Sequence, residues 1–329
     1  MKHKRLLSLA AIATLHGAAL AQSSVVIYGR VDVSVTKQNS GTTSLNASNG
    51  QTGEAGNRWD VRQGSAGRLG FRGQEDLGAG WNANFLMEHR FQPDTGVAEN
   101  PFWQARSFVE LGSPYGAVYL GREYIPAFWP ALRLDPWGFD TVGTMGPKHQ
   151  FALYTIDGGT RSNNTVGYKT PSVAGFTAQF SQALGEGGSR KRATGANVEY
   201  RKGAIYFGAA LDRVDSNQEM KLIGGAYDFG VVRPALTFTK STVAGIKYSN
   251  VSLAATAPIG RGTLKAALSK LDPNGDDNDT TRVGLGYEHF LSKRTSVYAD
   301  VGSADQQGRA AGRELTRTTA VDFGLKHQF

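Results

Sequence analysis

The chain has 329 residues, of which 42 are glycine and none is cysteine, and it carries 36 basic against 28 acidic side chains. The lack of cysteine excludes a disulfide scaffold, thiol catalysis and cysteine-ligated metal sites, so stability must come from an extended hydrogen-bonded framework. Glycine exceeds its usual share of about 7% without an excess of proline, which argues against a low-complexity chain.

The first 21 residues have the pattern of a secretory signal peptide. A basic head that ends at Arg5 precedes an apolar run from Leu6 to Leu15, and Ala19-Leu20-Ala21 provides a small-x-small ending. The apolar run is too short for a transmembrane helix, which needs about 20 residues. We expect cleavage after Ala21, which exports the rest of the chain and lowers the formal charge from +8 to +5.

Alternating apolar and polar residues fill most of the chain after residue 21. In residues 205–212, Ile205, Phe207 and Leu211 fall on one face, and small or polar residues fall on the other. Strict alternation is typical of a strand between two different environments. About sixteen such strands are predicted, at residues 25–37, 66–75, 81–91, 103–112, 117–124, 161–170, 175–183, 193–201, 204–213, 220–229, 231–240, 246–258, 262–271, 279–290, 294–303 and 317–329.

The connections between these strands alternate between short and long, with few exceptions. Gly78-Ala79-Gly80 and Lys202-Gly203 are short, whereas residues 38–65, 92–102 and 125–160 are long. Transmembrane barrels alternate in this way because one rim has tight turns and the other has long external loops. The sequence therefore predicts an all-β fold, in which residues 22–329 form a transmembrane antiparallel β-barrel of about sixteen strands.

Charged side chains fall on the strand face opposite to the apolar one. Because each unpaired charge would cost several kcal/mol in a dry core, the barrel interior must hold water. A polar interior inside an apolar exterior predicts a channel. The predicted inward-facing charges are Arg30, Asp32, Arg68, Arg72, Glu88, Arg90, Arg106, Glu110, Glu199, Asp228, Arg233, Lys265, Arg282, Glu288, Asp300, Asp322 and Lys326.

Five stretches carry a resemblance to a known family. They are residues 23–32, 67–78, 104–111, 115–124 and the ending Phe323-Gly324-Leu325-Lys326-His327-Gln328-Phe329. These stretches resemble the general trimeric porins of Gram-negative bacteria, particularly the β-proteobacterial branch. The resemblance implies a sixteen-stranded homotrimer in the outer membrane, in contact with membrane lipids and lipopolysaccharide, that passes small hydrophilic solutes and ions by passive diffusion.

The resemblance also implies that the third long connection, residues 125–160, folds inward and narrows the pore. This segment holds Phe128, Trp129 and Trp137, which would be poorly placed in bulk water. An external loop that packs at a subunit contact is the alternative interpretation. Asp135 and Asp140 would lie at the constriction, where they would oppose a preference for anions.

Five arginines from the first four predicted strands are expected to face the lumen together. A row of guanidinium groups attracts anions, as charged rings do in channels, and predicts a mild anion preference. Structural pairing with Asp32, Glu88 and Glu110 is the alternative. The five are Arg30, Arg68, Arg72, Arg90 and Arg106.

Arg122 and the terminal Phe329 are two further candidate functional residues. Arg122 shares its strand face with Val118 and Leu120, so alternation places it at the lipid interface, whereas the resemblance favours a bulge that turns it into the pore. The terminal aromatic Phe329 is expected to be recognised by the barrel-assembly machinery.

Other function classes find little support in the sequence. His149, His289 and His327 are scattered, and no catalytic triad, metal-ligand spacing, cofactor motif or nucleic-acid motif stands out. An enzyme is therefore not expected. A substrate-selective channel for a sugar or organic acid, a barrel enzyme and an adhesive barrel remain as alternatives.

Overall fold

The computed structural model describes residues 24–45, 57–156, 159–185, 192–274, 278–310 and 313–329. The predicted signal peptide, residues 1–21, lies outside the described residues. No helix in these ranges is long and apolar enough to span a bilayer. The elements are β1 (Ser24–Gln38), β2 (Trp59–Gln63), β3 (Gly67–Gly78), β4 (Trp81–Phe91), β5 (Arg106–Ser113), β6 (Gly116–Tyr124), α1 (Phe128–Leu134), α2 (Pro147–Gln150), β7 (Arg161–Lys169), β8 (Phe176–Ala183), β9 (Ala193–Lys202), β10 (Ile205–Asp215), β11 (Gln218–Tyr227), β12 (Arg233–Val243), β13 (Ile246–Ile259), β14 (Gly262–Pro273), β15 (Thr280–Phe290), β16 (Thr295–Gln306), β17 (Arg309–Ala310), β18 (Arg313–Glu314) and β19 (Thr318–Gln328).

All strands except the β17–β18 hairpin belong to one antiparallel sheet that closes into a barrel. β1 closes it, since this strand pairs with β3 on one side and with β19 on the other. β2 and β3 pair with successive parts of β1, so they form one interrupted strand of the wall. The seventeen labelled strands of the sheet therefore make sixteen barrel strands, which confirms the predicted fold.

The outer face of the barrel is apolar and the inner face is small or polar. In β13, Val251 and Leu253 are exposed, whereas their neighbours Ser252 and Ala254 are buried. In lipid every backbone polar group needs a partner within the protein, and a closed sheet provides one for each strand. The exposed apolar face is therefore the surface that contacts lipid.

Turn length follows the predicted alternation with two exceptions. The connections at residues 79–80, 114–115 and 203–204 are tight, and those at 92–105 and 125–160 are long. On the long-loop rim, however, β10–β11 and β12–β13 are joined by only two residues each. β2 falls within the predicted 38–65 connection and was not predicted, because five residues are too few to show alternation clearly.

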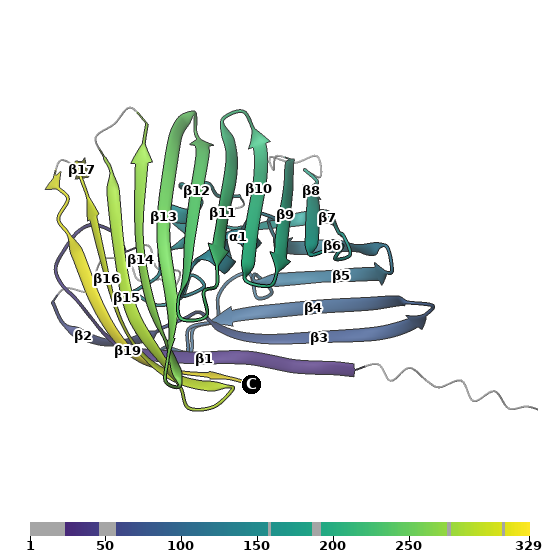
Figure 1. Cartoon of the computed structure of the whole chain (residues 1–329), viewed down its shortest axis with the longest axis horizontal. Coiled ribbons are helices and arrows are strands. Elements are labelled where there is room, and N and C mark those ends of the chain that lie inside the picture. The colour runs from purple at the N-terminus through teal and green to yellow at the C-terminus, as the bar shows by residue number, and fades with distance from the viewer. Residues whose placement is uncertain (1–23, 46–56, 157–158, 186–191, 275–277, 311–312) are drawn as a thin grey trace, which may run out of the picture.

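The connection 125–160 is hereafter called the inner loop. Its described parts, residues 125–156 and 159–160, run through the lumen, and α1 lies inside the barrel against β10, β11 and β12 (Figure 1). The inward-folded loop of the prediction is confirmed, and the external position is excluded. Glycines on the wall make room for the loop backbone. A β-carbon on Gly284 would collide with the carbonyl oxygen of Gly143, and one on Gly302 would collide with that of Val142.

This close approach predicts the effect of a larger side chain on the wall. Gly302→Val should displace the inner loop, because overpacking a filled site costs about 1–3 kcal/mol. We expect a lower unfolding temperature and a higher single-channel conductance than in the natural protein. Ala299→Val, on the exposed face of the same strand, is the control and should change neither value. Unchanged conductance in Gly302→Val would contradict the proposed contact.

Candidate functional site

The first helix of the inner loop has one face on the wall and one toward the lumen. Phe128, Ala131 and Leu134 are buried, whereas Trp129 and Leu132 are partly exposed. The spacing of three residues between the buried positions places them on one side of the helix. With seven residues and an internal proline, α1 is too short to show a helical period in the sequence, so it was not predicted.

Two aspartates on the last strands of the barrel fix the tip of the inner loop. Asp300 of β16 accepts hydrogen bonds from the indole N–H of Trp137 at 2.8 Å and from the hydroxyl of Thr141 at 2.7 Å. Asp322 of β19 accepts a hydrogen bond from the backbone N–H of Val142 at 3.3 Å. Both carboxylates are buried, so these contacts hold the loop where bulk water does not compete.

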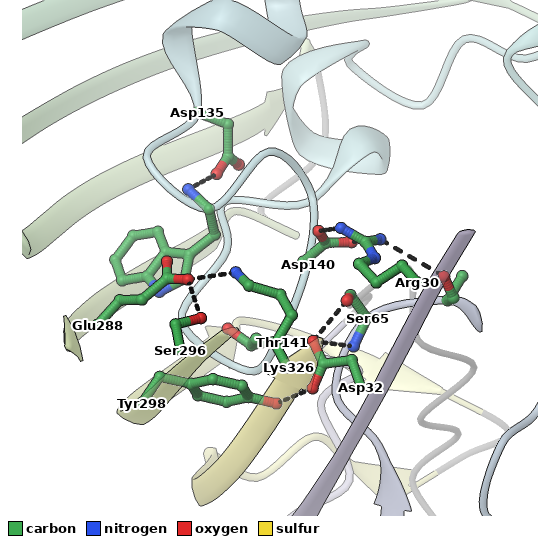
Figure 2. Close-up of polar contacts among 12 residues, drawn as sticks. Arg30, Asp32, Ser65, Asp135, Asp140, Thr141, Glu288, Ser296, Tyr298 and Lys326 are labelled. Carbon is green, nitrogen blue, oxygen red and sulfur yellow. Dashed lines mark hydrogen bonds and ion pairs between the residues drawn. The ribbon is translucent and has the colours of Figure 1, made fainter. Parts of the chain in front are cut away.

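The same tip is also bonded to the first strands (Figure 2). The backbone N–H of Thr141 donates to the carbonyl oxygen of Gly64, in the interruption between β2 and β3, at 3.1 Å. Asp32 of β1 holds this interruption, since it accepts from the backbone N–H of Ser65 at 3.1 Å and from the hydroxyl of Tyr298 at 2.7 Å. The inner loop therefore contacts both sides of the β1–β19 junction.

Asp135 lies within the inner loop and not on the cavity wall. Its carboxylate accepts from the backbone N–H groups of Trp137 and Met145, at 2.8 Å and 3.0 Å, and from the hydroxyl of Thr144 at 2.8 Å. Burial raises the pKa of the Asp135 carboxyl. The structure thus differs from the expectation that Asp135 faces the constriction, because this side chain satisfies donors of its own loop.

Three arginines face one another directly across the first strands. Arg30 pairs with Arg68 in the β1–β3 register, and Arg68 pairs with Arg90 in the β3–β4 register. Arg30 donates two hydrogen bonds to Asp140 of the inner loop, at 2.7 Å and 3.1 Å (Figure 2). Arg90 forms an ion pair with Glu88 at 2.9 Å. Two members of the row are therefore neutralised by neighbouring carboxylates.

Arg68 is the member of this row that no carboxylate bonds directly, although Glu88 and Asp140 lie near enough to act on its charge. Among the described residues it has no hydrogen-bond or ion-pair partner, and its Nε is buried without one. Like charges directly opposite each other on a sheet are destabilising, so the row costs the fold stability. An unpaired guanidinium between two others marks a place where an anion would be bound favourably.

Two further arginines extend the basic wall. Arg106 of β5 donates from Nε to Glu123 at 2.7 Å, and Arg161 of β7 donates to the hydroxyl of Tyr124 at 2.6 Å. Arg161 was not among the predicted site residues. Its signal was its position at the start of a strand directly after the longest connection, on the face opposite to the exposed Val166.

These side chains border a cavity of about 410 Å³ between the wall and the inner loop. Five basic and three acidic side chains line it, so positive charge prevails. The charged lining residues are Arg68, Arg90, Arg106, Lys148, Arg161, Glu88, Glu99 and Asp140.

The structure places three of the predicted arginines outside the lining of this cavity: Arg30, which bonds Asp140, and the pair Arg72 and Arg122. Arg72 is exposed, with its guanidinium carbon 5.3 Å from the ring centroid of Tyr28. Arg122 donates to the carbonyl oxygen of Gln104 and to the side chain of Asn163, both at 2.6 Å. The β6–β7 register does shift between residues 121 and 123, but Arg122 does not join the cavity lining.

A closed barrel with an apolar exterior and a charged lumen narrowed by an inner loop is a transmembrane channel. Comparisons with known proteins identify its kind. The family model of Gram-negative porins matches residues 8–309. Outer membrane porin protein 32 of Delftia acidovorans is 30% identical, and the alignment covers 99% of both chains. An outer membrane porin of Bordetella pertussis is 26% identical over 99% of this chain and 100% of its own.

The solved structures agree with the sequence matches. An anion-selective porin from Comamonas acidovorans superposes with a TM-score of 0.77 at 28% identity, and the match covers 94% of this chain and 100% of the other. The chain belongs to the Gram-negative porin family, and it is a channel of the outer membrane.

His149 of α2 gives the inner loop a pH-sensitive contact with the wall. The imidazole is fully buried, and its Nδ1 lies 3.5 Å from the hydroxyl of Ser269. Burial, together with the nearby charge of Arg282, lowers the pKa of His149 to about 3. The folded protein therefore holds this side chain neutral at pH values where the unfolded chain would protonate it.

Acidification should accordingly weaken the docked loop. The contribution of a neutral His149 is complete above its ordinary pKa of 6.5 and is lost as the pH falls toward 3. The loss is at most about 1.4 kcal/mol for each pH unit below the ordinary value. We expect the unfolding temperature of the natural protein in detergent to fall more steeply between pH 7 and pH 4 than that of His149→Gln. The exposed His327→Gln is the control and should keep the natural slope.

Proposed function

We propose that this porin passes small hydrophilic solutes by passive diffusion with a mild preference for anions. The single observation that carries this proposal is the unpaired Arg68 in the row with Arg30 and Arg90. The excess of basic over acidic side chains around the cavity supports it. So does the likeness to the Comamonas porin, whose description is anion-selective.

Electrostatic focusing is the proposed mechanism. A narrow aqueous passage between low-dielectric walls concentrates the field of fixed charges, and this raises the local concentration of anions. We assign the field mainly to Arg68, since Arg90 and Arg106 are each paired with a carboxylate. An anion leaves the passage quickly because the guanidinium groups replace only part of its hydration shell and because it moves between several weak sites.

Removal of the unpaired charge tests this mechanism. In Arg68→Gln we expect the reversal potential across a salt gradient to move toward cations in about 0.1 M salt, where the Debye length is about 10 Å, and to change little near 1 M salt, where it is about 3 Å. The measurement is made on purified protein in planar bilayers. Arg294→Gln, in the exposed turn before β16, removes the same charge far from the cavity and should leave the potential unchanged. A selectivity of Arg68→Gln that equals that of the natural protein at low salt would refute the proposed field.

We further propose a homotrimer that is inserted by the barrel-assembly machinery after residues 1–21 have directed export. Apolar side chains on the outer face of the first and last strands, such as Val35 and Phe323, offer a surface for subunit contact. Phe329 supports an assembly role, because its backbone exchanges hydrogen bonds of 3.0 Å and 3.1 Å with Gly29 while its ring remains exposed.

Deletion of Phe329 should lower the amount of folded trimer in the outer membrane, because the barrel loses both the closing backbone pair and the exposed terminal ring. The amount is measured by gel electrophoresis of unheated membranes. Conversion of Phe329 to Tyr keeps an aromatic end and should restore most of the yield. A wild-type band at monomer mass alone would contradict the trimer, and an unchanged yield after deletion would contradict the assembly role.

A further inference from the structure

The cavity at the constriction has two chemically different walls. The barrel side supplies guanidinium and carboxylate groups. The inner-loop side supplies the charges of Lys148 and Asp140 and, in larger number, apolar and aromatic groups, among them Trp129, Leu132 and Phe139. Trp129 and Leu132 are only partly buried and so present apolar surface to the cavity. A passage used only by hydrated inorganic ions gains nothing from such surface, because apolar groups do not replace water around an ion.

Trp129 is held in place from several sides. The guanidinium carbons of Arg106 and Arg133 lie 5.3 Å and 5.7 Å from the centroid of its ring. Tyr124 and Phe128 meet it edge-to-face, each with ring centroids 5.5 Å away. An indole fixed in this way offers its exposed part as an apolar contact at little further cost in side-chain entropy.

Positive charge lies next to this apolar surface. Arg106 is close enough to Trp129 for a cation–π contact, but its charge is already paired with Glu123. Arg68 lines the same cavity and has no partner among the described residues. The cavity volume of about 410 Å³ falls within the range of about 300–1,000 Å³ that is common for small-molecule sites.

We propose that this cavity is a binding site for carboxylates that carry an aromatic ring, which makes the channel selective for this class among anions. The proposal rests on the proposed function, since it assumes an open, anion-preferring pore. The carboxylate of the solute binds the guanidinium of Arg68, and its ring packs against Trp129 and Leu132. Both parts of the solute are needed. A carboxylate without a ring is attracted by all the basic side chains and is not held at one place, and a ring without a carboxylate leaves the charge of Arg68 unneutralised.

The test is competition for the chloride current of the purified full-length protein in planar bilayers. Three probes separate the two parts of the site: benzoate has ring and charge, acetate has the charge only, and benzyl alcohol has the ring only. We expect benzoate to reduce the current in a saturable way at a concentration at least about tenfold lower than acetate, which corresponds to about 1.4 kcal/mol. Benzyl alcohol should give no saturable effect.

Two substitutions assign the contacts. Trp129→Ala should raise the half-blocking concentration of benzoate about fivefold to tenfold and leave that of acetate unchanged, consistent with the loss of one aromatic contact. Arg68→Gln should weaken both carboxylates. Trp59→Ala removes an exposed tryptophan outside the cavity and is the matched control. Trp129→Leu keeps an apolar side chain and provides the same comparison should the alanine variant fail to fold.

The possible results separate this inference from the proposed function. A channel that conducts chloride with an anion preference but is blocked equally by benzoate and acetate overturns the aromatic site and leaves the proposed function intact. Block by benzyl alcohol as strong as that by benzoate also overturns it. A pore without anion preference refutes the proposed function itself.

Discussion

Pairing of the first strand with the last is the constraint on which the rest of this structure depends. β1 pairs with β3 through its first half and with β19 through its second half, and the terminal Phe329 bonds to the backbone of Gly29. Lipid offers no partner to an unpaired strand edge, so the sheet is stable there only when it is closed. Closure in turn creates the lumen, and the water in the lumen permits charged residues on the inner face of most strands.

The lumen carries an electrostatic cost that the rest of the fold offsets only in part. The row of Arg30, Arg68 and Arg90 places like charges side by side, which a sheet selected for stability alone would avoid. Asp140 and Glu88 compensate the outer two members. The middle member, Arg68, has no ion pair of its own, which is an unfavourable local feature of the kind that natural proteins retain at functional sites.

Strand positions were predictable because lipid and water impose opposite demands on alternate residues, as Val251 to Ala254 illustrate. The inner loop lacks that pattern, so its two short helices were not predicted. Asp135 and Asp140 have the same chemistry and lie five residues apart, yet one bonds its own loop and the other bonds Arg30. Only the three-dimensional path of the loop separates these roles. Alternation could have predicted that Arg161 faces the lumen. Its position in the cavity lining depends on its hydrogen bond to Tyr124, which the sequence spacing does not reveal.

The position of the inner loop across the β1–β19 junction links pore width to the integrity of the barrel. Its tip is bonded to Gly64 on one side of the junction and to Asp300 and Asp322 on the other, so these bonds coexist only when the sheet is closed. Loop and junction are thus thermodynamically coupled, and each raises the free energy needed to break the other. A shorter inner loop would widen the constriction, but it would also weaken the β1–β19 junction. Substitution of side chains that line the cavity is therefore the less destabilising way to evolve a new permeability.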